Sequence, residues 1–167
     1  MAASGGVSSS VPRVLTLWCP EWPVHVAPPV QEPLIVLDQH RVIAACPSAR
    51  DAGVRTGDRR RTALRACPNA TVVSRDYSAE VQAFERVVSA VAEIIPLVEL
   101  LEPGSLCLDM RGPTRYFGGE HSVVDHVRSV VENQLAAEVP IGIGVADGRA
   151  ASAIAARRSG VVHQPVI

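Results

Sequence analysis

The order in which short apolar segments and longer amphipathic segments follow one another constrains the fold of this chain most strongly. Residues 14–17 predict a buried strand, and residues 76–167 predict a helix, two strands, a helix, a strand, a helix and a last strand. Between them, residues 24–75 predict a small unit with short strands and helices of its own. Without this insertion, the order β-αββ-αβ-α is typical of a ferredoxin-like sheet covered by helices. We therefore expect an α+β fold with an inserted small α/β lobe.

Proline and capping residues predict where the elements begin and end. The connection 20–33 is rich in proline, so we expect no regular structure there. Ser78 is expected to cap a long amphipathic helix, and Ser122, with Asp125 at capping-box spacing, is expected to open the next one. Residues 160–167 predict a last strand.

The domain organisation follows from this order. Residues 1–12 are small and polar, without the basic and apolar parts of a signal peptide, so we expect a disordered leader. The first strand and its exit occupy 13–23, the inserted lobe 24–75, and the main body 76–167. No apolar run is long enough to span a bilayer.

The cysteines and histidines predict no metal or cofactor site. Two of the histidines, His121 and His126, are five residues apart and lie on different faces of a helix, and none has ligand spacing with a cysteine. All 16 basic residues are Arg, so no lysine can act in catalysis or phosphate binding. The four cysteines form no CxxC pair and lie in or beside apolar segments, which predicts buried thiols in a reducing cytoplasm: Cys19, Cys46, Cys67 and Cys107.

Charge is divided unevenly along the chain. Residues 24–75 hold eight Arg against four acidic residues, whereas 76–167 hold seven Arg against twelve. An anionic partner of the inserted lobe or chance clustering explains this equally well. Arg59, Arg60 and Arg61 form the sharpest cluster, at the expected start of a helix, where cations meet the positive end of the helix dipole. Contacts to DNA phosphates would explain that placement, and a solvated face is the alternative.

Three segments resemble the Y-family translesion DNA polymerases and, within them, the ImuB proteins. Residues 48–70, SARDAGVRTGDRRRTALRACPNA, are similar in spacing to the E-A-R-x-x-G-V-x-x-G…A…PNA segment of the family's fingers. Residues 141–156, IGIGVADGRAASAIAA, are similar to the palm segment G-I-x-x-N-K-x-x-A-K-x-A, and LCLDM at 106–110 to the strand after the catalytic Asp-Glu. The resemblance implies a ferredoxin-like polymerase palm with an inserted fingers lobe.

The positions of the family's metal-binding carboxylates carry other residues here. The first Asp falls at Trp18, and the Asp-Glu pair falls at Gly104 and Ser105. Asp109 matches the last Asp of that motif, which does not hold the metals, and Glu21 is the only acid near the first position. Two Mg²⁺ ions need several oxygen ligands, so the resemblance implies a vacated active site without metal or catalytic residues.

The family's triphosphate contacts are also largely replaced. Its Tyr-x-x-Arg falls at Pro47 and Arg50, its palm lysine at Ala153, and its aromatic steric gate at Pro23. Only the arginine of these residues is retained.

Three remaining side chains each have two interpretations. Trp18 and Trp22 either plug the cavity left by lost polar groups, which we favour, or bind a partner. Arg50 either holds a phosphate or forms a surface salt bridge with Asp51 or Asp58.

The resemblance implies that the protein is not an enzyme but an adaptor in DNA-damage-induced mutagenesis, as part of the SOS response. It would bring together a sliding clamp, a RecA-like accessory protein and an error-prone C-family polymerase that performs translesion synthesis, mostly through regions beyond these residues. Weak, non-specific DNA binding is expected through Arg59, Arg60 and Arg61. The alternatives are an active Y-family translesion polymerase with displaced metal ligands and a protein-interaction domain without DNA affinity.

Overall fold

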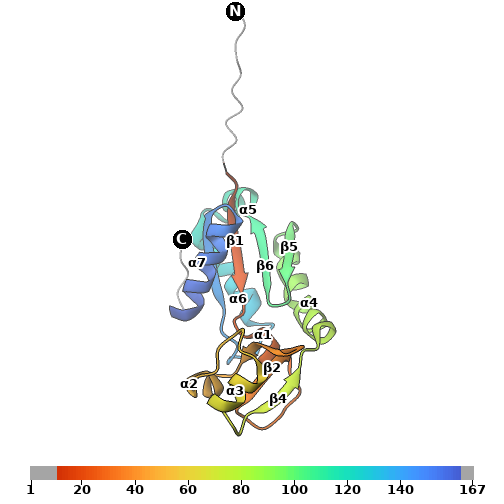
Figure 1. Ribbon diagram of the computed structural model, residues 1–167. Coiled ribbons are helices and arrows are strands. Elements are labelled where there is room, and N and C mark those ends of the chain that lie inside the picture. Colours follow the sequence, from red (N-terminus) through yellow and green to blue (C-terminus); the bar gives the residue numbers. More distant parts are fainter. Residues whose placement is uncertain (1–10, 163–167) are drawn as a thin grey trace, which may run out of the picture.

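The computed structural model describes residues 11–162 and has two lobes, each built around its own sheet (Figure 1). The larger lobe contains four strands in the order β5-β6-β1-β7, and each neighbouring pair is antiparallel. These strands are β1 (Arg13–Trp18), β5 (Val98–Glu102), β6 (Ser105–Asp109) and β7 (Gly142–Asp147). Its helices are α4 (Tyr77–Ile94), α5 (Arg111–Phe117), α6 (Glu120–Glu132) and α7 (Arg149–Val162). This order confirms the predicted α+β, ferredoxin-like fold.

The smaller lobe is inserted between β1 and α4. Its sheet has the order β3-β2-β4, in which β2 (Leu34–Asp38) and β3 (Arg41–Ala45) form an antiparallel hairpin and β4 (Thr71–Ser74) runs parallel to β2. The helices α2 (Pro47–Asp51) and α3 (Arg60–Ala66) contribute apolar side chains to a core that is separate from that of the larger lobe. The small helix α1 (Trp22–Val26) lies at the junction of the two lobes.

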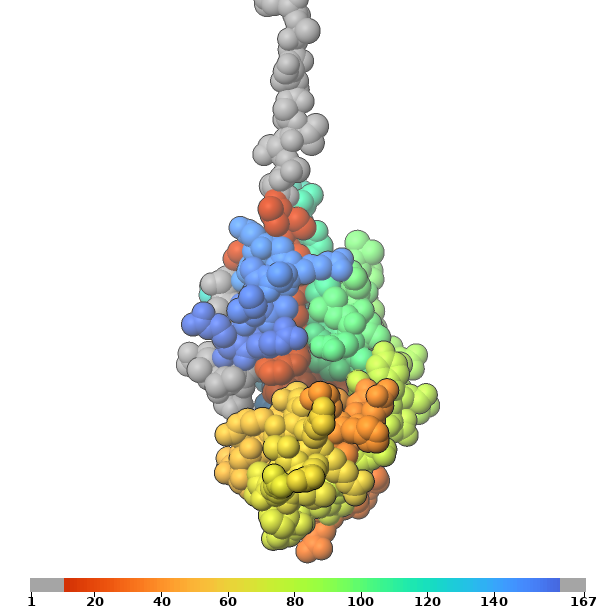
Figure 2. Space-filling view, viewed as in Figure 1, coloured from red at the N-terminus to blue at the C-terminus, as the bar shows by residue number. Residues whose placement is uncertain are grey.

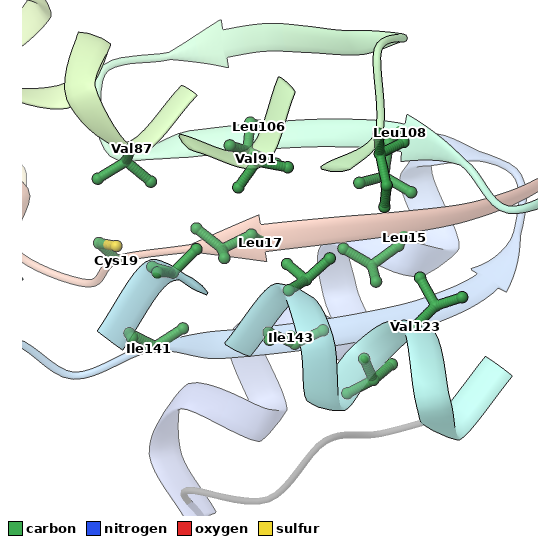
Figure 3. Packing of buried hydrophobic residues seen from close by; sticks show 14 of the residues in the cluster. Leu15, Leu17, Cys19, Val87, Val91, Leu106, Leu108, Val123, Ile141 and Ile143 are labelled. Carbon is green, nitrogen blue, oxygen red and sulfur yellow. The ribbon is translucent and has the colours of Figure 1, made fainter. Parts of the chain in front are cut away.

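Alternation along β1 produces the main core of the larger lobe. Successive strand residues point to opposite faces, so Leu15 and Leu17 face one side of the sheet while Thr16 and Trp18 face the other. On the first side, helices α4 and α6 pack against the sheet (Figure 3). Each buried Val or Leu there contributes about 1.5–3 kcal/mol. The core residues that Figure 3 labels are Leu15, Leu17, Cys19, Val87, Val91, Leu106, Leu108, Val123, Ile141 and Ile143.

Helix α7 lies on the opposite side of the sheet, over β1 and β7 (Figure 1). A side chain at Gly144 of β7 would overlap the backbone of α7 at Ser152 and Ala156, so only glycine allows this close approach. The Thr16 and Ser152 hydroxyls, 2.7 Å apart and buried, hydrogen-bond across the same interface. These contacts determine where the rest of α7 lies relative to the end of β1.

Several element boundaries differ from the sequence prediction. Helix α1 forms inside the proline-rich 20–33 connection, because a proline in the first turn of a helix lacks only a hydrogen bond that this turn does not make. Asp76, not Ser78, caps α4, since its carboxylate accepts a hydrogen bond from the Ala79 backbone N–H at 2.9 Å. Helix α6 begins at Glu120 rather than at Ser122.

The prediction for the C-terminal segment 160–167 is wrong over the part that the structure describes. Residues 160–162 continue α7 instead of starting a strand. A glycine in a helix costs only about 1 kcal/mol, which the neighbouring helix-forming alanines offset. Residues 163–167 and most of the predicted leader lie outside the described residues. The predicted domain boundaries stay predictions. Within residues 11–162, no helix is long and apolar enough to cross a membrane.

Candidate functional site

The ends of β1 and β6 meet where the two lobes join. Trp18, the last residue of β1, lies directly opposite Ser105, the first residue of β6. The Cys19 backbone N–H donates a hydrogen bond to the Gly104 carbonyl at 2.7 Å, and the Ser105 hydroxyl donates to the Leu17 carbonyl at 3.1 Å. The structure therefore brings together the three positions to which the resemblance assigns metal-binding carboxylates.

The side chains at these strand ends do not fit a two-metal centre. Trp18 offers no oxygen ligand, Gly104 has no side chain, and the Ser105 hydroxyl is engaged by a backbone carbonyl. Within residues 11–162, no group of three or more His, Cys, Asp or Glu side chains is placed to hold a metal ion. Because hard divalent cations need several oxygen ligands, no metal-dependent step can be assigned to these side chains.

Glu21, the nearest acid, joins the two lobes. It has a left-handed backbone with φ 55° and precedes α1. One carboxylate oxygen accepts a hydrogen bond from the Ala45 N–H of β3 at 2.7 Å, and the other lies 3.3 Å from the Arg50 guanidinium. The sequence suggested a salt bridge of Arg50 with Asp51 or Asp58. In the structure, Arg50 pairs with Glu21 instead.

Trp22 fills the space beneath the turn between β5 and β6. Its side chain is 4% exposed, and its indole N–H donates to the Glu80 carbonyl at 3.1 Å. The ring meets Phe84 edge to face, with 5.2 Å between centroids. A Cβ at Gly104 would lie 2.6 Å from the Trp22 Cβ, so Trp22 occupies the volume that a side chain at 104 would need. The plugging prediction is confirmed for Trp22.

Trp18 is less enclosed than Trp22. It is half-buried, and the guanidinium of Arg157 from α7 lies over its ring at 5.6 Å from the centroid. The same guanidinium lies 3.9 Å from the Glu102 carboxylate at the end of β5. Trp18 is only partly buried and lines a cleft, so its interpretation as a plug stays a prediction.

A cleft of about 470 Å³ opens next to Trp18, between the two lobes. Two of the positions expected to contact a triphosphate, Pro47 and Arg50 of α2, line it, whereas Pro23 in α1 and Ala153 in α7 do not. His25 lines the cleft as well, and burial lowers the pKa of its imidazole, which favours the neutral form.

The predicted DNA contacts lie on the small lobe and are not among the residues that line this cleft. Arg59, Arg60 and Arg61 are exposed at the N-terminus of α3. An isolated antiparallel bridge places Arg41 beside Arg59, which extends the cluster. We call Arg41, Arg59, Arg60 and Arg61 the basic patch; Figure 2 shows their lobe below the larger one, in orange to yellow. Sequence reasoning missed Arg41, because only the fold brings it to residue 59. Phosphate contact by this patch stays a prediction.

A partly buried ion pair links Arg75, just before α4, to Glu80 in the first turns of that helix, and sequence reasoning did not find it. The Glu80 carboxylate is 1% exposed and lies 2.6 Å from the Arg75 guanidinium. This hydrogen-bonded pair raises the pKa of Arg75, whose guanidinium also lies over the Tyr77 ring at 5.0 Å. Removing Arg75 would leave the Glu80 carboxylate buried without its charged partner, so this contact stabilises the start of α4.

The predicted burial of the four thiols is confirmed, and His126 makes structural contacts. All four cysteines are buried and free, and burial raises the pKa of the Cys19 thiol to about 12, so it is not a nucleophile at neutral pH. His126 packs against Phe117 and hydrogen-bonds through Nδ1 with the Ser122 carbonyl at 2.7 Å. Asp109 lies at the far end of β6 and accepts a hydrogen bond from the Arg111 N–H at 2.7 Å.

The family model and the curated relatives that match this chain point to the same protein family. The model of the impB/mucB/samB family matches residues 28–157. DNA polymerase IV 2 of Halalkalibacterium halodurans is 29% identical over 107 residues, which are 62% of this chain and 25% of that protein. DNA polymerase IV of Pseudomonas syringae pv. tomato is 29% identical over 119 residues, 71% of this chain and 33% of that protein.

Solved structures show the same fold. A ternary complex of Dbh superposes with a TM-score of 0.73 at 21% identity, covering 88% of this chain and 45% of that one. DinB from Sulfolobus solfataricus gives a TM-score of 0.67 at 19% identity, covering 87% of this chain and 45% of that one. The chain thus spans less than half the length of these relatives.

These comparisons contradict the prediction that the protein is not an enzyme. Both curated relatives are named as DNA polymerases, and so is a solved neighbour. The prediction relied on a few strand-end positions, whereas the match to the polymerases extends through both lobes. Because the family model covers residues 28–157, well over half of the sequence, the chain belongs to the impB/mucB/samB family within the Y-family DNA polymerases.

Proposed function

We propose that this chain is the palm and fingers part of a protein that binds primer–template DNA during translesion synthesis. The observation that carries the proposal is the family match, which includes all strands of the small lobe and three of the four strands of the larger one. The exposed basic patch supports it, because exposed arginines on one lobe suit contacts with DNA phosphates.

A scaffold role of the ImuB type is a second candidate. It is favoured by one observation: Trp18, Gly104 and Ser105 come together where a metal-binding site would need carboxylates. In this role, the bound DNA would be presented to an error-prone C-family polymerase, together with a sliding clamp and a RecA-like accessory protein. Much of that assembly would use regions other than the two lobes described here.

Binding to labelled primer–template DNA, followed by fluorescence anisotropy, tests the first proposal. We expect weak binding without sequence preference, with a dissociation constant in the micromolar range or weaker. No binding at low salt would contradict the proposal.

Primer extension separates the two roles. Extension across a lesion by this protein alone would support a polymerase role. Extension that needs a C-family polymerase, and that increases when this protein is added, would support the scaffold role.

A further inference from the structure

The two tryptophans of this chain differ in burial, and only Trp22 belongs to the main core. Trp22 is enclosed by protein and has its indole N–H satisfied. Trp18 is half-buried at the mouth of the cleft between the lobes, and the Arg157 guanidinium lies over its ring. Because Trp18 points to the same side of the sheet as Thr16, it belongs to the α7 side and not to the main core.

We propose that Trp18 is a stacking platform for an unpaired nucleobase of the bound DNA, with Arg50 and Arg157 contacting the adjoining phosphates. The inference rests on the DNA binding proposed above and names a contact within it. Aromatic rings flanked by arginines are the arrangement by which proteins hold single-stranded nucleic acid without reading its sequence.

The space beside Trp18 suits such a ligand. The cleft has a volume of about 470 Å³, within the range of roughly 300–1,000 Å³ that is typical of small-molecule sites. Trp18 forms part of its wall, and Arg50 of α2 lies on the wall formed by the other lobe. A base that enters the cleft therefore meets an aromatic ring on the larger lobe and a cation on the smaller one, while the carboxylates of Glu21 and Glu138 also line the cleft.

The two arginines are available for phosphate. Their present partners are distant, at 3.3 Å for Arg50 and Glu21 and 3.9 Å for Arg157 and Glu102. Charge-assisted hydrogen bonds are normally about 2.7–2.9 Å long, and exposed pairs with longer contacts are weak. Both guanidinium side chains are about half exposed, at 44% and 53%. A phosphate can therefore replace either carboxylate, and Glu102 in particular competes with the DNA for Arg157.

Tryptophan fluorescence tests the proposal, because Trp18 and Trp22 are the only tryptophans of the chain. The full chain is titrated with a labelled oligothymidylate, while anisotropy of the label reports binding and tryptophan emission reports stacking. We expect binding to quench about half of the emission and to protect Trp18 from acrylamide. In Trp18→Ala, the quenching should disappear and the affinity should fall about tenfold, the effect of losing one stacked base.

Matched variants separate stacking from a change in fold. Trp18→Phe keeps a ring and should retain most of the affinity. Glu102→Gln should strengthen binding, and Arg157→Gln should weaken it. Tyr116→Ala removes an aromatic ring that is 84% exposed at the other end of the larger lobe, so it should change nothing.

Each outcome decides the matter. Binding by anisotropy without quenching or acrylamide protection overturns the stacking proposal and leaves the proposed DNA binding intact. Absence of any binding to the oligothymidylate overturns the stacking proposal, whereas the proposed DNA binding is overturned only if primer–template DNA also fails to bind. If Trp18→Ala does not fold, as judged by its thermal melt, acrylamide protection of the unaltered chain decides, since it needs no variant.

Discussion

Gly104 and Trp22 share one small volume at the junction of the lobes. The backbone at Gly104 has φ 88°, and a Cβ there would lie 2.6 Å from the Trp22 Cβ. The left-handed backbone and the close contact with Trp22 each disfavour a larger residue, so glycine is required at this turn for two separate reasons. The packing of a single tryptophan thus explains why a carboxylate cannot occupy position 104 in this fold without displacing Trp22.

Gly104→Ala should lower the free energy of unfolding by about 2–4 kcal/mol. About 1–2 kcal/mol comes from the left-handed backbone, and the rest comes from overpacking against Trp22. Gly57→Ala is the matched control, because Gly57 has φ 90° but no atom within 4 Å of the new Cβ. Urea unfolding of both variants checks this prediction. Equal losses in the two variants would show that Trp22 does not fill the space.

Glu120 links α6 to the start of β1. Its carboxylate accepts hydrogen bonds from the Arg13 guanidinium at 2.7 and 2.9 Å, and these bonds lower the pKa of Glu120. The unfolded carboxylate, with a pKa of about 4.3, therefore takes up protons before the folded one does. The stabilisation is complete above about pH 4.3 and is lost as the pH falls further, through the pKa of the folded form.

Glu120→Gln should thus reduce the stability at neutral pH by no more than about 1 kcal/mol, because the pair is partly exposed. The difference from the unaltered chain should shrink as the pH falls below about 4.3. Urea unfolding across this range, with Glu93→Gln as a control at an exposed position, measures it. A difference that is independent of pH would contradict the role of the Arg13 contact.

At the scale of elements, α7 determines the surroundings of Trp18. Gly144 allows the backbone of α7 to touch β7, and the hydrogen bond between Thr16 and Ser152 anchors the first half of the helix. Arg157 follows less than two turns later and lies over Trp18. The position of α7 therefore determines how far Trp18 at the end of β1 is exposed and places the positive charge of Arg157 beside it.

Gly144→Ala should be strongly destabilising, by about 3 kcal/mol or more, because backbone atoms of α7 must move to admit the methyl group. Ala151→Ser on the exposed side of α7 should change stability by less than about 0.5 kcal/mol. Thermal melts measure both effects, and the emission of Trp18 should change only in the first variant. A Gly144→Ala protein with unchanged stability would show that α7 does not lie this close to the sheet.

The elements also show what the sequence could predict and why. Helices α4 and α6 were predictable because their apolar residues recur every three or four positions over many residues. Helix α5, RGPTRYF, has no buried residue and carries a glycine and a proline in its first turn, so no periodic signal exists. The resemblance, and not a local pattern, predicted that Trp18 and Ser105 lie at the strand ends where the family has carboxylates.

Long-range polar contacts were not predictable in the same way. The pair Glu21–Arg50 joins residues 29 positions apart and depends on how the two lobes meet, which no local pattern in the sequence records. The same holds for the bridge that brings Arg41 next to Arg59. For this reason the basic cluster was found from the sequence as three adjacent residues, but its full extent was not.

At the scale of the whole molecule, charge and shape are divided between the lobes. The inserted lobe, with eight Arg against four acidic residues, carries the basic patch, and the larger lobe is acidic. The two meet at a cleft that Trp18 and Arg50 line. This division of charge supports the proposal that DNA contacts the small lobe through its phosphates. The association rate and the affinity of such binding would then depend on the salt concentration.

The salt dependence of DNA binding tests this account most directly. Affinity for primer–template DNA is measured between about 50 and 200 mM salt for the unaltered chain and for Arg59→Ala/Arg60→Ala/Arg61→Ala. Each phosphate contact contributes about −0.9 to the log–log slope, so the triple variant should bind every sequence more weakly, with a slope flatter by up to about three units. Replacing the exposed Arg86, Arg111 and Arg115 of the larger lobe by Ala removes the same charge and should leave the slope nearly unchanged. If the first variant binds as tightly as the unaltered chain with the same slope, the cluster is a solvated face, and the proposed role of the small lobe in DNA binding is wrong.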